Sequence, residues 1–125
     1  MKLKKLTTLL VVDAIEPCLE TWQALDYEIA VRVPDEGTLG FVILAGPSGE
    51  LMLQTRASLK QDLPAVLALA PTHLLYGDVH SLAEAQHGLP SARVIVPERK
   101  TFYGATEIWF ELEAGVILGL AEHKG

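Results

Sequence analysis

The chain has 125 residues and a formal charge of −6, from sixteen acidic and ten basic side chains. This length is typical of one domain, and the negative charge makes nucleic acid an unfavourable partner because its phosphates would be repelled. Half of the residues are hydrophobic and 21% are charged, a composition that excludes a disordered chain.

The first element is an apolar segment, residues 6–12, that follows three lysines within residues 2–5. Its continuity and β-branched content predict a buried strand. The segment is too short to span a membrane and Asp13 interrupts it, so we expect no export signal, no membrane partner and a cytoplasmic location. The single cysteine, Cys18, has no partner for an internal disulfide, which agrees with a reducing compartment.

A helix is predicted to follow this strand. Asp13 and Glu16 have the spacing of a capping box, and Pro17 is tolerated in the first turn. Apolar residues at i, i+3, i+4 and i+7 then fall on one stripe, which we expect to face a sheet. The residues of this stripe are Ile15, Cys18, Leu19 and Trp22.

Three further strands and a connector complete the first half. Alternating or continuous apolar residues between turns rich in Gly, Pro and Asp predict the strands. A short amphipathic helix is expected in the connector that follows, where Pro64 interrupts the pattern. The predicted strands are residues 27–33, 39–45 and 50–56.

The second half repeats this order of elements. A strand over residues 72–77 is followed by a helix over 79–87, which Gly88 ends, and then by three strands. A tight turn at residues 113–115 separates the last two. These three strands are predicted at residues 93–96, 106–112 and 116–122.

The repeat is also visible in the residues themselves. Residues 31–34, Val-Arg-Val-Pro, match residues 94–97, Val-Ile-Val-Pro, and Gly49 recurs as Gly115. A period of about 65 residues indicates a duplicated βαβββ unit of the α+β class whose sheets pack together. The expected single domain has repeat one at about 6–56, a connector at 57–70 and repeat two at about 71–123. The alternative is an ordinary α+β domain with chance similarity between its halves.

Several stretches resemble a known family in their order and spacing. They are Val11-Val12-Asp13 before a helix with Trp22, Leu25-Asp26-Tyr27-Glu28, residues 50–54, Thr72 to Gly77, and Tyr103 to Ile108 before Gly115. With the doubled unit, they resemble the vicinal oxygen chelate superfamily of glyoxalase I, bleomycin-resistance proteins, fosfomycin-resistance enzymes and extradiol dioxygenases. This resemblance implies a cup-shaped, mostly antiparallel mixed sheet, a ligand between its concave faces, and a homodimer.

The resemblance also implies where a metal would bind. Metal-dependent members take four ligands from the first, fourth, fifth and eighth strands, and these positions fall here on Leu6, Met52, His73 and Gly119. Of these side chains, only His73 offers a ligand for a divalent cation. Glu122 is an alternative, but strand alternation places it on the face opposite to Gly119. We therefore expect no resident metal cofactor, with His73 as a ligand only if a metal is bound.

Strand alternation predicts which side chains line the ligand pocket. Flat apolar surface with a few converging polar groups is typical of small-ligand sites. The simpler alternatives are that Tyr103 and Trp109 belong to the sheet core, that Glu107 faces solvent and that Gln54 is a polar residue of an edge strand. A buried Glu107 beside His73 would form a proton-transfer pair. The predicted pocket consists of Met52, Gln54, His73, Tyr103, Glu107 and Trp109.

These features predict a protein of the glyoxalase and bleomycin-resistance type that binds a small organic molecule without a complete metal site. The first alternative is a metal-dependent lyase, isomerase or ring-cleaving dioxygenase of the same superfamily, in which the metal polarises adjacent oxygens. The second is a non-catalytic interaction module. The sequence leaves open whether any reaction is catalysed.

Overall fold

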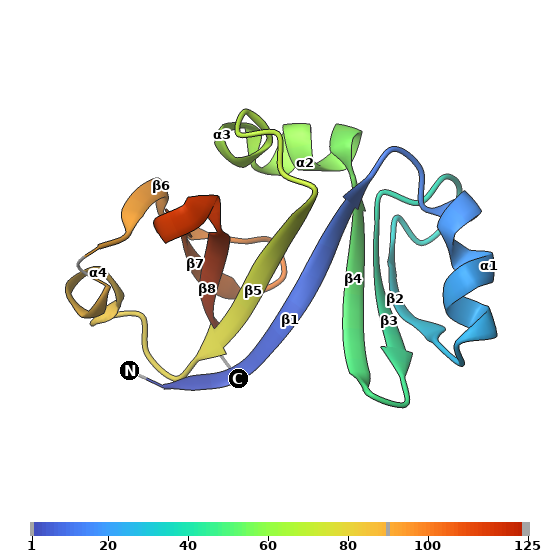
Figure 1. The fold of residues 1–125 in the computed structure, drawn as a ribbon, viewed down its shortest axis with the longest axis horizontal. Helices are drawn as coiled ribbons and strands as arrows, with labels where there is room; N and C mark the ends of the chain where they lie inside the picture. Colours follow the sequence, from blue (N-terminus) through green and yellow to red (C-terminus); the bar gives the residue numbers. More distant parts are fainter. Residues whose placement is uncertain (1, 90, 124–125) are drawn as a thin grey trace. The chain divides into compact units, whose positions relative to one another are not determined.

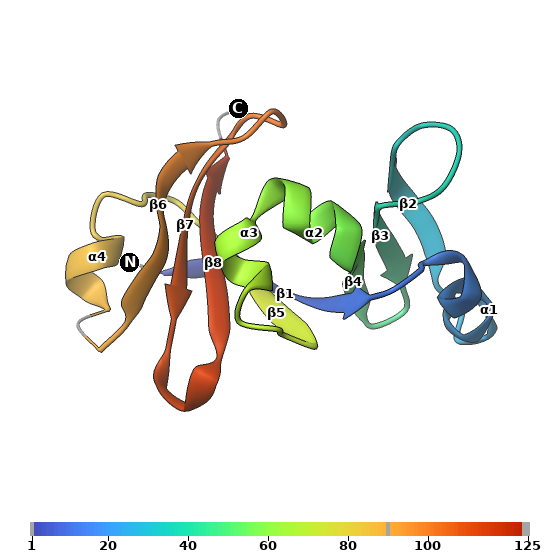
Figure 2. The same ribbon diagram turned by 90° about the horizontal axis from the view of Figure 1, so that it is seen from above.

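The computed structural model describes residues 2–89 and 91–123 (Figures 1 and 2). Within these residues the chain forms eight strands and a few short helices, which confirms the predicted α+β class. Contacts divide the chain into two compact units. The first unit is Thr8–His73, and the second unit is Met1–Thr7 together with Leu74–Gly125. The opening strand β1 (Leu3–Val12) therefore contributes to both units.

The first unit has the predicted strand, helix and three-strand order. Its strands are arranged β2-β3-β4-β1, with antiparallel neighbours except for the parallel pair of β4 and β1. In Figure 1, helix α1 lies beside this sheet. After β1, the elements are α1 (Glu16–Ala24), β2 (Glu28–Val33), β3 (Phe41–Gly46) and β4 (Gly49–Thr55).

The second unit repeats this order. Its strands follow the sequence β1-β5-β8-β7-β6, and only the pair of β5 and β8 has a parallel register among the pairs of β5 to β8. Figure 2 shows β6, β7 and β8 side by side, with α4 next to them. The duplicated βαβββ unit is thereby confirmed. The elements are β5 (His73–Val79), α4 (Ala85–Gly88), β6 (Arg93–Lys100), β7 (Ala105–Glu111), the short 3₁₀ helix η1 (Glu113–Gly115) and β8 (Ile117–His123).

Each unit has its own apolar core between a sheet and a helix. In the first unit the predicted stripe of α1 does face the sheet, with Ile15 fully buried and Cys18, Leu19 and Trp22 packed against the same core. The second core surrounds α4. Its buried residues are Val79, Leu82, Ala85, Ile108, Phe110, Leu118 and Leu120.

The connector forms two helices where one was predicted. α2 (Arg56–Asp62) is capped by Thr55, whose Oγ1 accepts a hydrogen bond from the backbone N–H of Ser58 at 3.1 Å. α3 (Pro64–Leu67) starts at the proline that interrupts the apolar pattern. Proline lacks the N–H that a continued helix needs, so it ends one helix and opens the next. Within the described residues, no helix is long and apolar enough to cross a bilayer.

The predicted capping box at the start of α1 is wrong. Ile15 occupies the cap position and provides no side-chain hydrogen bond. Glu16 instead accepts a hydrogen bond from the backbone N–H of Leu39 at 2.8 Å, and this bond is the main cause of its lowered pKa. Asp13 forms an ion pair with Arg56 at 2.6 Å. Both carboxylates have found partners that are distant in the sequence, in place of the neighbouring N–H groups that a capping box requires.

The predicted helix over residues 79–87 is also wrong at its start. β5 continues through Val79, and α4 comprises only Ala85–Gly88. The backbone N–H of Leu82 donates to Oε1 of Glu122 at 2.8 Å, a tertiary bond that holds this segment outside a regular helix. Glu122 thus lies on the α4 side of β8 and has a protein partner there.

The strand that was predicted to end before Pro97 extends to Lys100. Its pairing with β7 shifts register between Val96 and Arg99. Such a bulge accommodates a proline, because the residue that cannot donate to the ladder is left out of it. The extension matters for the site, since it carries Arg99 on β6.

Candidate ligand-binding site

In the first unit, two predicted pocket residues project from the sheet face that points away from α1. Val42 and Leu53 pair across β3 and β4 and are fully buried in the core with α1. Met52 and Gln54 flank Leu53, so alternation places both on the other face. They are 9% and 7% exposed, and Gln54 Nε2 donates to Ser58 Oγ at 3.0 Å. At these two positions the face presents a thioether and one oriented amide.

His73 lies at the end of the first unit, where β5 begins. It is exposed, and its Nδ1 is 3.2 Å from the hydroxyl of Thr72. Three positions separate His73 from Tyr76, so alternation along β5 places these two side chains on opposite sides of the strand. His73 is therefore the weakest member of the predicted set.

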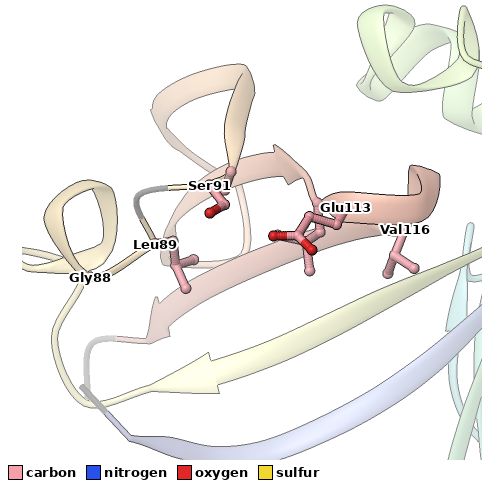
Figure 3. A pocket seen from close by; sticks show the side chains of 7 residues that line it. Gly88, Leu89, Ser91, Glu113 and Val116 are labelled. Atoms are coloured by element: carbon pink, nitrogen blue, oxygen red, sulfur yellow. The ribbon is translucent and has the colours of Figure 1, made fainter.

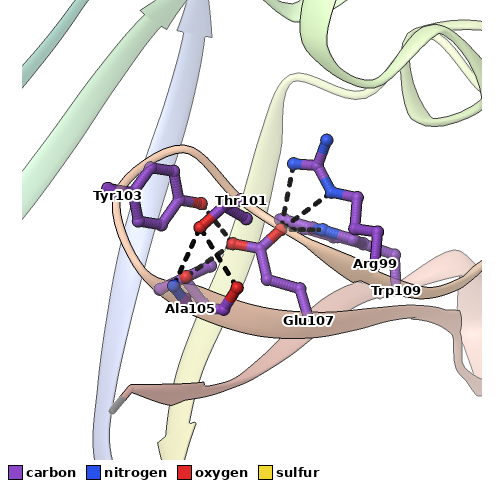
Figure 4. A network of polar contacts seen from close by, with 7 residues as sticks. Arg99, Thr101, Tyr103, Ala105, Glu107 and Trp109 are labelled. Atoms are coloured by element: carbon purple, nitrogen blue, oxygen red, sulfur yellow. Dashed lines mark hydrogen bonds and ion pairs between the residues drawn. The ribbon is translucent and has the colours of Figure 1, made fainter. Parts of the chain in front are cut away.

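In the second unit, the three remaining predicted residues come together on β7 and the turn before it (Figure 4). Ile108 and Phe110 face the core with α4, so Glu107 and Trp109 project from the opposite face. The indole Nε1 of Trp109 donates to Oε1 of Glu107 at 3.0 Å, and the hydroxyl of Tyr103 donates to Oε2. Tyr103 lies on the turn that precedes β7, so strand alternation does not apply to its side chain.

Two further residues that the sequence analysis missed complete this cluster. Tyr76 on β5 donates its hydroxyl to Glu107 Oε2 at 2.6 Å. Arg99 on β6 donates from Nε and Nη2 to Glu107 Oε1, at 3.2 and 3.0 Å. Tyr76 stood in one of the stretches that carried the resemblance, but Arg99 lay beyond the predicted end of its strand. We call these five residues, Tyr76, Arg99, Tyr103, Glu107 and Trp109, the Glu107 cluster.

The hydrogen bonds keep the carboxylate of Glu107 ionised. Glu107 has no exposed surface, and burial by itself raises its pKa. Bonds from Tyr103, Tyr76 and Trp109, with the charge of Arg99, outweigh burial, so the pKa of Glu107 is lowered. Burial and then the charge of Glu107 raise the pKa of Tyr76, whose hydroxyl stays a donor. A carboxylate with a low pKa is a weak base, which disfavours the predicted proton-transfer role.

Rings surround the exposed side of the Glu107 cluster. The ring of Tyr76 lies 5.9 Å from that of Trp109 and 6.5 Å from that of His123, and the rings of Tyr103 and His123 are 6.4 Å apart. His123 Nε2 lies 3.2 Å from Oδ1 of Asp78, an ion-pair distance. Trp109 is 2% exposed whereas Tyr103 is 46% exposed, so of these two rings only the indole is buried.

The residues at the four positions for a metal do not fit a divalent cation. Leu6, Met52 and Gly119 have no donor side chain, which leaves His73 alone. A Cβ on Gly119 would lie 2.6 Å from the indole of Trp109, so the ring fills the space of any larger side chain there. Among the described residues, no three His, Cys, Asp or Glu side chains are grouped closely enough to hold an ion.

Each unit also has a shallow recess away from the predicted residues. The recess of the second unit has a volume of about 390 Å³ and lies between the segment before β6 and the turn before β8 (Figure 3). The recess of the first unit has a volume of about 480 Å³ and lies beside α2. Neither recess is lined by a member of the Glu107 cluster. The first-named recess is lined by Gly88, Leu89, Ser91, Ala92, Leu112, Glu113 and Val116.

Comparison with known proteins finds relatives in structure but none in sequence. No protein-family model and no curated protein matches the sequence. A superfamily member from Vibrio splendidus 12B01, described as a glyoxalase/bleomycin resistance protein/dioxygenase, has a TM-score of 0.67 at 14% identity, covering 94% of this chain and 97% of its own. A chain described as NAD-dependent benzaldehyde dehydrogenase from Legionella pneumophila has a TM-score of 0.70 at 16% identity, covering 96% and 100%. A Staphylococcus aureus protein has a TM-score of 0.68 at 20% identity, covering 99% and 100%.

The likeness to the Vibrio splendidus protein confirms the predicted glyoxalase-like fold. The chains from Vibrio splendidus and Legionella pneumophila are described with different activities, so this fold does not by itself indicate which reaction, if any, a chain catalyses. The function has to be inferred from the residues of the site.

Proposed function

We propose that this protein binds a small organic molecule, as a member of the glyoxalase and bleomycin-resistance type, without a complete metal site. The observation that carries the proposal is the Glu107 cluster: a fully buried, ionised carboxylate that receives five hydrogen bonds on the sheet face opposite to α4. Its donors come from β5, β6, β7 and the turn before β7.

Stability alone is a poor explanation for such a cluster. Burying a carboxylate costs free energy, and well-packed apolar residues are often as stabilising as a buried ion pair. What the carboxylate does achieve is orientation, because each donor is fixed by a directional bond. Glu107 thereby holds two phenol rings, an indole and a guanidinium in place. Oriented polar groups beside flat apolar surface are the composition of small-ligand sites.

The residues have separate roles in the proposed site. The rings of Tyr76 and Trp109 provide apolar area, and the buried Glu107 holds the polar groups of the site in a fixed orientation. Tyr103 and His123 are the more exposed rings of this site. Met52, Gln54 and His73 remain proposed ligand-binding residues of the first unit by itself, where Gln54 has the orienting role.

The metal-dependent alternative receives no support from the donor chemistry. Three of its four positions have no donor side chain, and the indole of Trp109 fills the space at the eighth-strand position, Gly119. No step through a metal is therefore derived.

Tryptophan fluorescence tests the proposal, because the chain has two tryptophans, one in each unit. In a Trp22→Phe protein, all tryptophan emission comes from Trp109. We expect saturable changes in this emission with members of a panel of small aromatic compounds, and a negative heat-capacity change by calorimetry because apolar surface is buried. The Trp109→Phe protein, which retains Trp22, is the matched control and should show no such change.

Two outcomes would contradict the proposal. One is the absence of any saturable change at Trp109 across the panel. The other is binding that a chelator abolishes and that Zn²⁺, Ni²⁺, Mn²⁺ or Fe²⁺ restores, since this would indicate a metal site.

The proposal includes a homodimer and a cytoplasmic location, both carried over from the sequence and the resemblance. Light scattering after size-exclusion chromatography measures the mass of the particle against the 13.6 kDa of one chain.

A further inference from the structure

We propose that the ligand of this site replaces Tyr103 at Glu107, and is therefore a neutral aromatic compound with an O–H or N–H donor on its ring. This inference rests on the proposed function and names the chemical class of its ligand. It starts from the difference between Tyr103 and the other donors to Glu107.

Of the four residues that donate to Glu107, Tyr103 is the one whose displacement from the carboxylate costs the least free energy. Tyr76, Arg99 and Trp109 lie on strands, whereas Tyr103 lies on the turn between β6 and β7. It is 46% exposed, and Trp109 is 2% exposed. Turns open more readily than paired strands, because fewer hydrogen bonds and apolar contacts have to be broken.

The turn itself is built to present this ring. Thr101 and Ala105 close it, with the N–H of Thr101 donating to the carbonyl of Ala105 at 2.8 Å and the N–H of Ala105 donating to Thr101 Oγ1 at 3.0 Å. Gly104 has a φ of 84°, which permits the reversal of the chain. Phe102, which is 86% exposed, packs edge to face on the ring of Tyr103, with 5.1 Å between the two ring centroids. Figure 4 shows Tyr103 reaching from this turn to Glu107.

The carboxylate sets the chemistry of any replacement. When Tyr103 leaves, Oε2 of Glu107 retains the bond from Tyr76 but loses one donor. A buried carboxylate with a missing partner is costly, so a ligand that restores the donor is favoured over one that does not. An anionic ligand is rejected, because Glu107 is itself ionised.

The space that Tyr103 occupies has the shape of a phenol ring. Its outer side is formed by the ring of His123, 6.4 Å away, and its inner end by the carboxylate. A planar ligand that enters here keeps the contact with His123 and places its hydroxyl at Oε2. The side chain of Tyr103 thus acts as a built-in competitor for the site.

The test uses three toluenes that differ only in the group at the para position. p-Cresol has a donor, 4-methylanisole has none, and 4-methylbenzoate is an anion. The readout is the indole N–H resonance of Trp109 in the ¹⁵N-labelled protein, which the Trp22→Phe variant assigns. This N–H bonds to the other oxygen of Glu107 and so reports on the carboxylate. The variant Tyr103→Phe removes the competing hydroxyl, and Tyr27→Phe, whose hydroxyl bonds to Ser48 in the first unit, is its matched control.

We expect p-cresol to shift the Trp109 resonance and to bind about tenfold or more tightly than the other two compounds, as a bond to a charged group implies. Tyr103→Phe should bind p-cresol at least about threefold more tightly than the wild type, with Tyr27→Phe unchanged. Equal affinity for p-cresol and 4-methylanisole, or no gain in Tyr103→Phe, overturns this inference while the proposed function stands. No shift of Trp109 by any compound, in the wild type and in Tyr103→Phe, overturns both.

Discussion

The two units share an order of strands but differ in the chemistry of the sheet face that points away from the helix. In the first unit this face carries Met52 and Gln54, which are uncharged. In the second unit it carries the ionised Glu107 with Trp109, and Arg99 is bonded to the carboxylate. The helix-facing sides are alike, since a cluster of buried apolar side chains forms the core of each.

The comparison separates what folding requires from what a site requires. Both units must bury one face of a sheet against a helix, so that face stays apolar in each. The other face is free of this requirement, and there the duplicated halves have diverged. The cross-strand pairs illustrate this: Ile43 lies opposite Met52 in the first unit, and Trp109 lies opposite Gly119 in the second. The first pair consists of two side chains of medium size, whereas in the second pair a large indole lies opposite a glycine, which has no side chain.

Replacing Glu107 should have the largest effect on this comparison. Glu107→Ala leaves the guanidinium of Arg99 and three other donors without their acceptor, at an expected cost of about 3–5 kcal/mol in the free energy of unfolding. Gln54→Ala, on the corresponding face of the first unit, should cost about 1 kcal/mol because it removes one neutral hydrogen bond. Urea denaturation measures both, and equal costs would show that the charged cluster is no more critical than the amide.

The second-largest effect on stability is expected from adding a methyl group at Gly119. Gly119→Ala forces Cβ against the indole of Trp109, 2.6 Å away, and overpacking of this kind costs about 1–3 kcal/mol. Met52→Leu, opposite Ile43 in the first unit, conserves volume and should cost less than about 1.5 kcal/mol. Gly119→Ala in a Trp109→Leu background should cost less than in the wild type. An unchanged cost in that background would rule out the indole as the cause.

The pH dependence of stability should distinguish the two faces. The pKa of Glu107 lies below its ordinary value of 4.5, so its ionisation stabilises the fold above that pH, and this stabilisation is lost as the pH falls through the lower, folded-state pKa. The difference in unfolding free energy between wild type and Glu107→Gln should be constant from about pH 7 to about pH 5 and shrink below about pH 4.5. For Gln54→Ala the difference should not vary with pH, because neither side chain titrates. A difference for Glu107→Gln that stays flat in acid would contradict an ionised Glu107.

The smallest effect is expected at a helix cap. α2 of the first unit is capped by the hydroxyl of Thr55, whereas α4 of the second unit has no side-chain cap. Thr55→Ala should lower the free energy of unfolding by about 1 kcal/mol, and Thr55→Ser, which retains the hydroxyl, by less. Thermal unfolding measures both variants, and a Ser variant as unstable as the Ala variant would exclude the cap as the reason.

Local patterns in the sequence predicted the features that depend on neighbouring residues. The stripe of Ile15, Cys18, Leu19 and Trp22 packs on the sheet because helical spacing alone places these side chains together. Alternation likewise places Glu107 and Trp109 on one face. The capping box at Asp13 and the long helix after Val79 were wrong because Glu16, Asp13 and the N–H of Leu82 bond to residues 23 or more positions away.

The sequence by itself determined the class of fold, the duplication and the faces of the strands, because periodicity and turn residues act over a few positions along the chain. Only the tertiary structure decided that Tyr76 and Arg99 meet Glu107, since those partners lie on β5 and β6 and are aligned with β7 by sheet order and by a bulge near Pro97. Whether a buried carboxylate is ionised depends on its partners in space, and no local pattern specifies them.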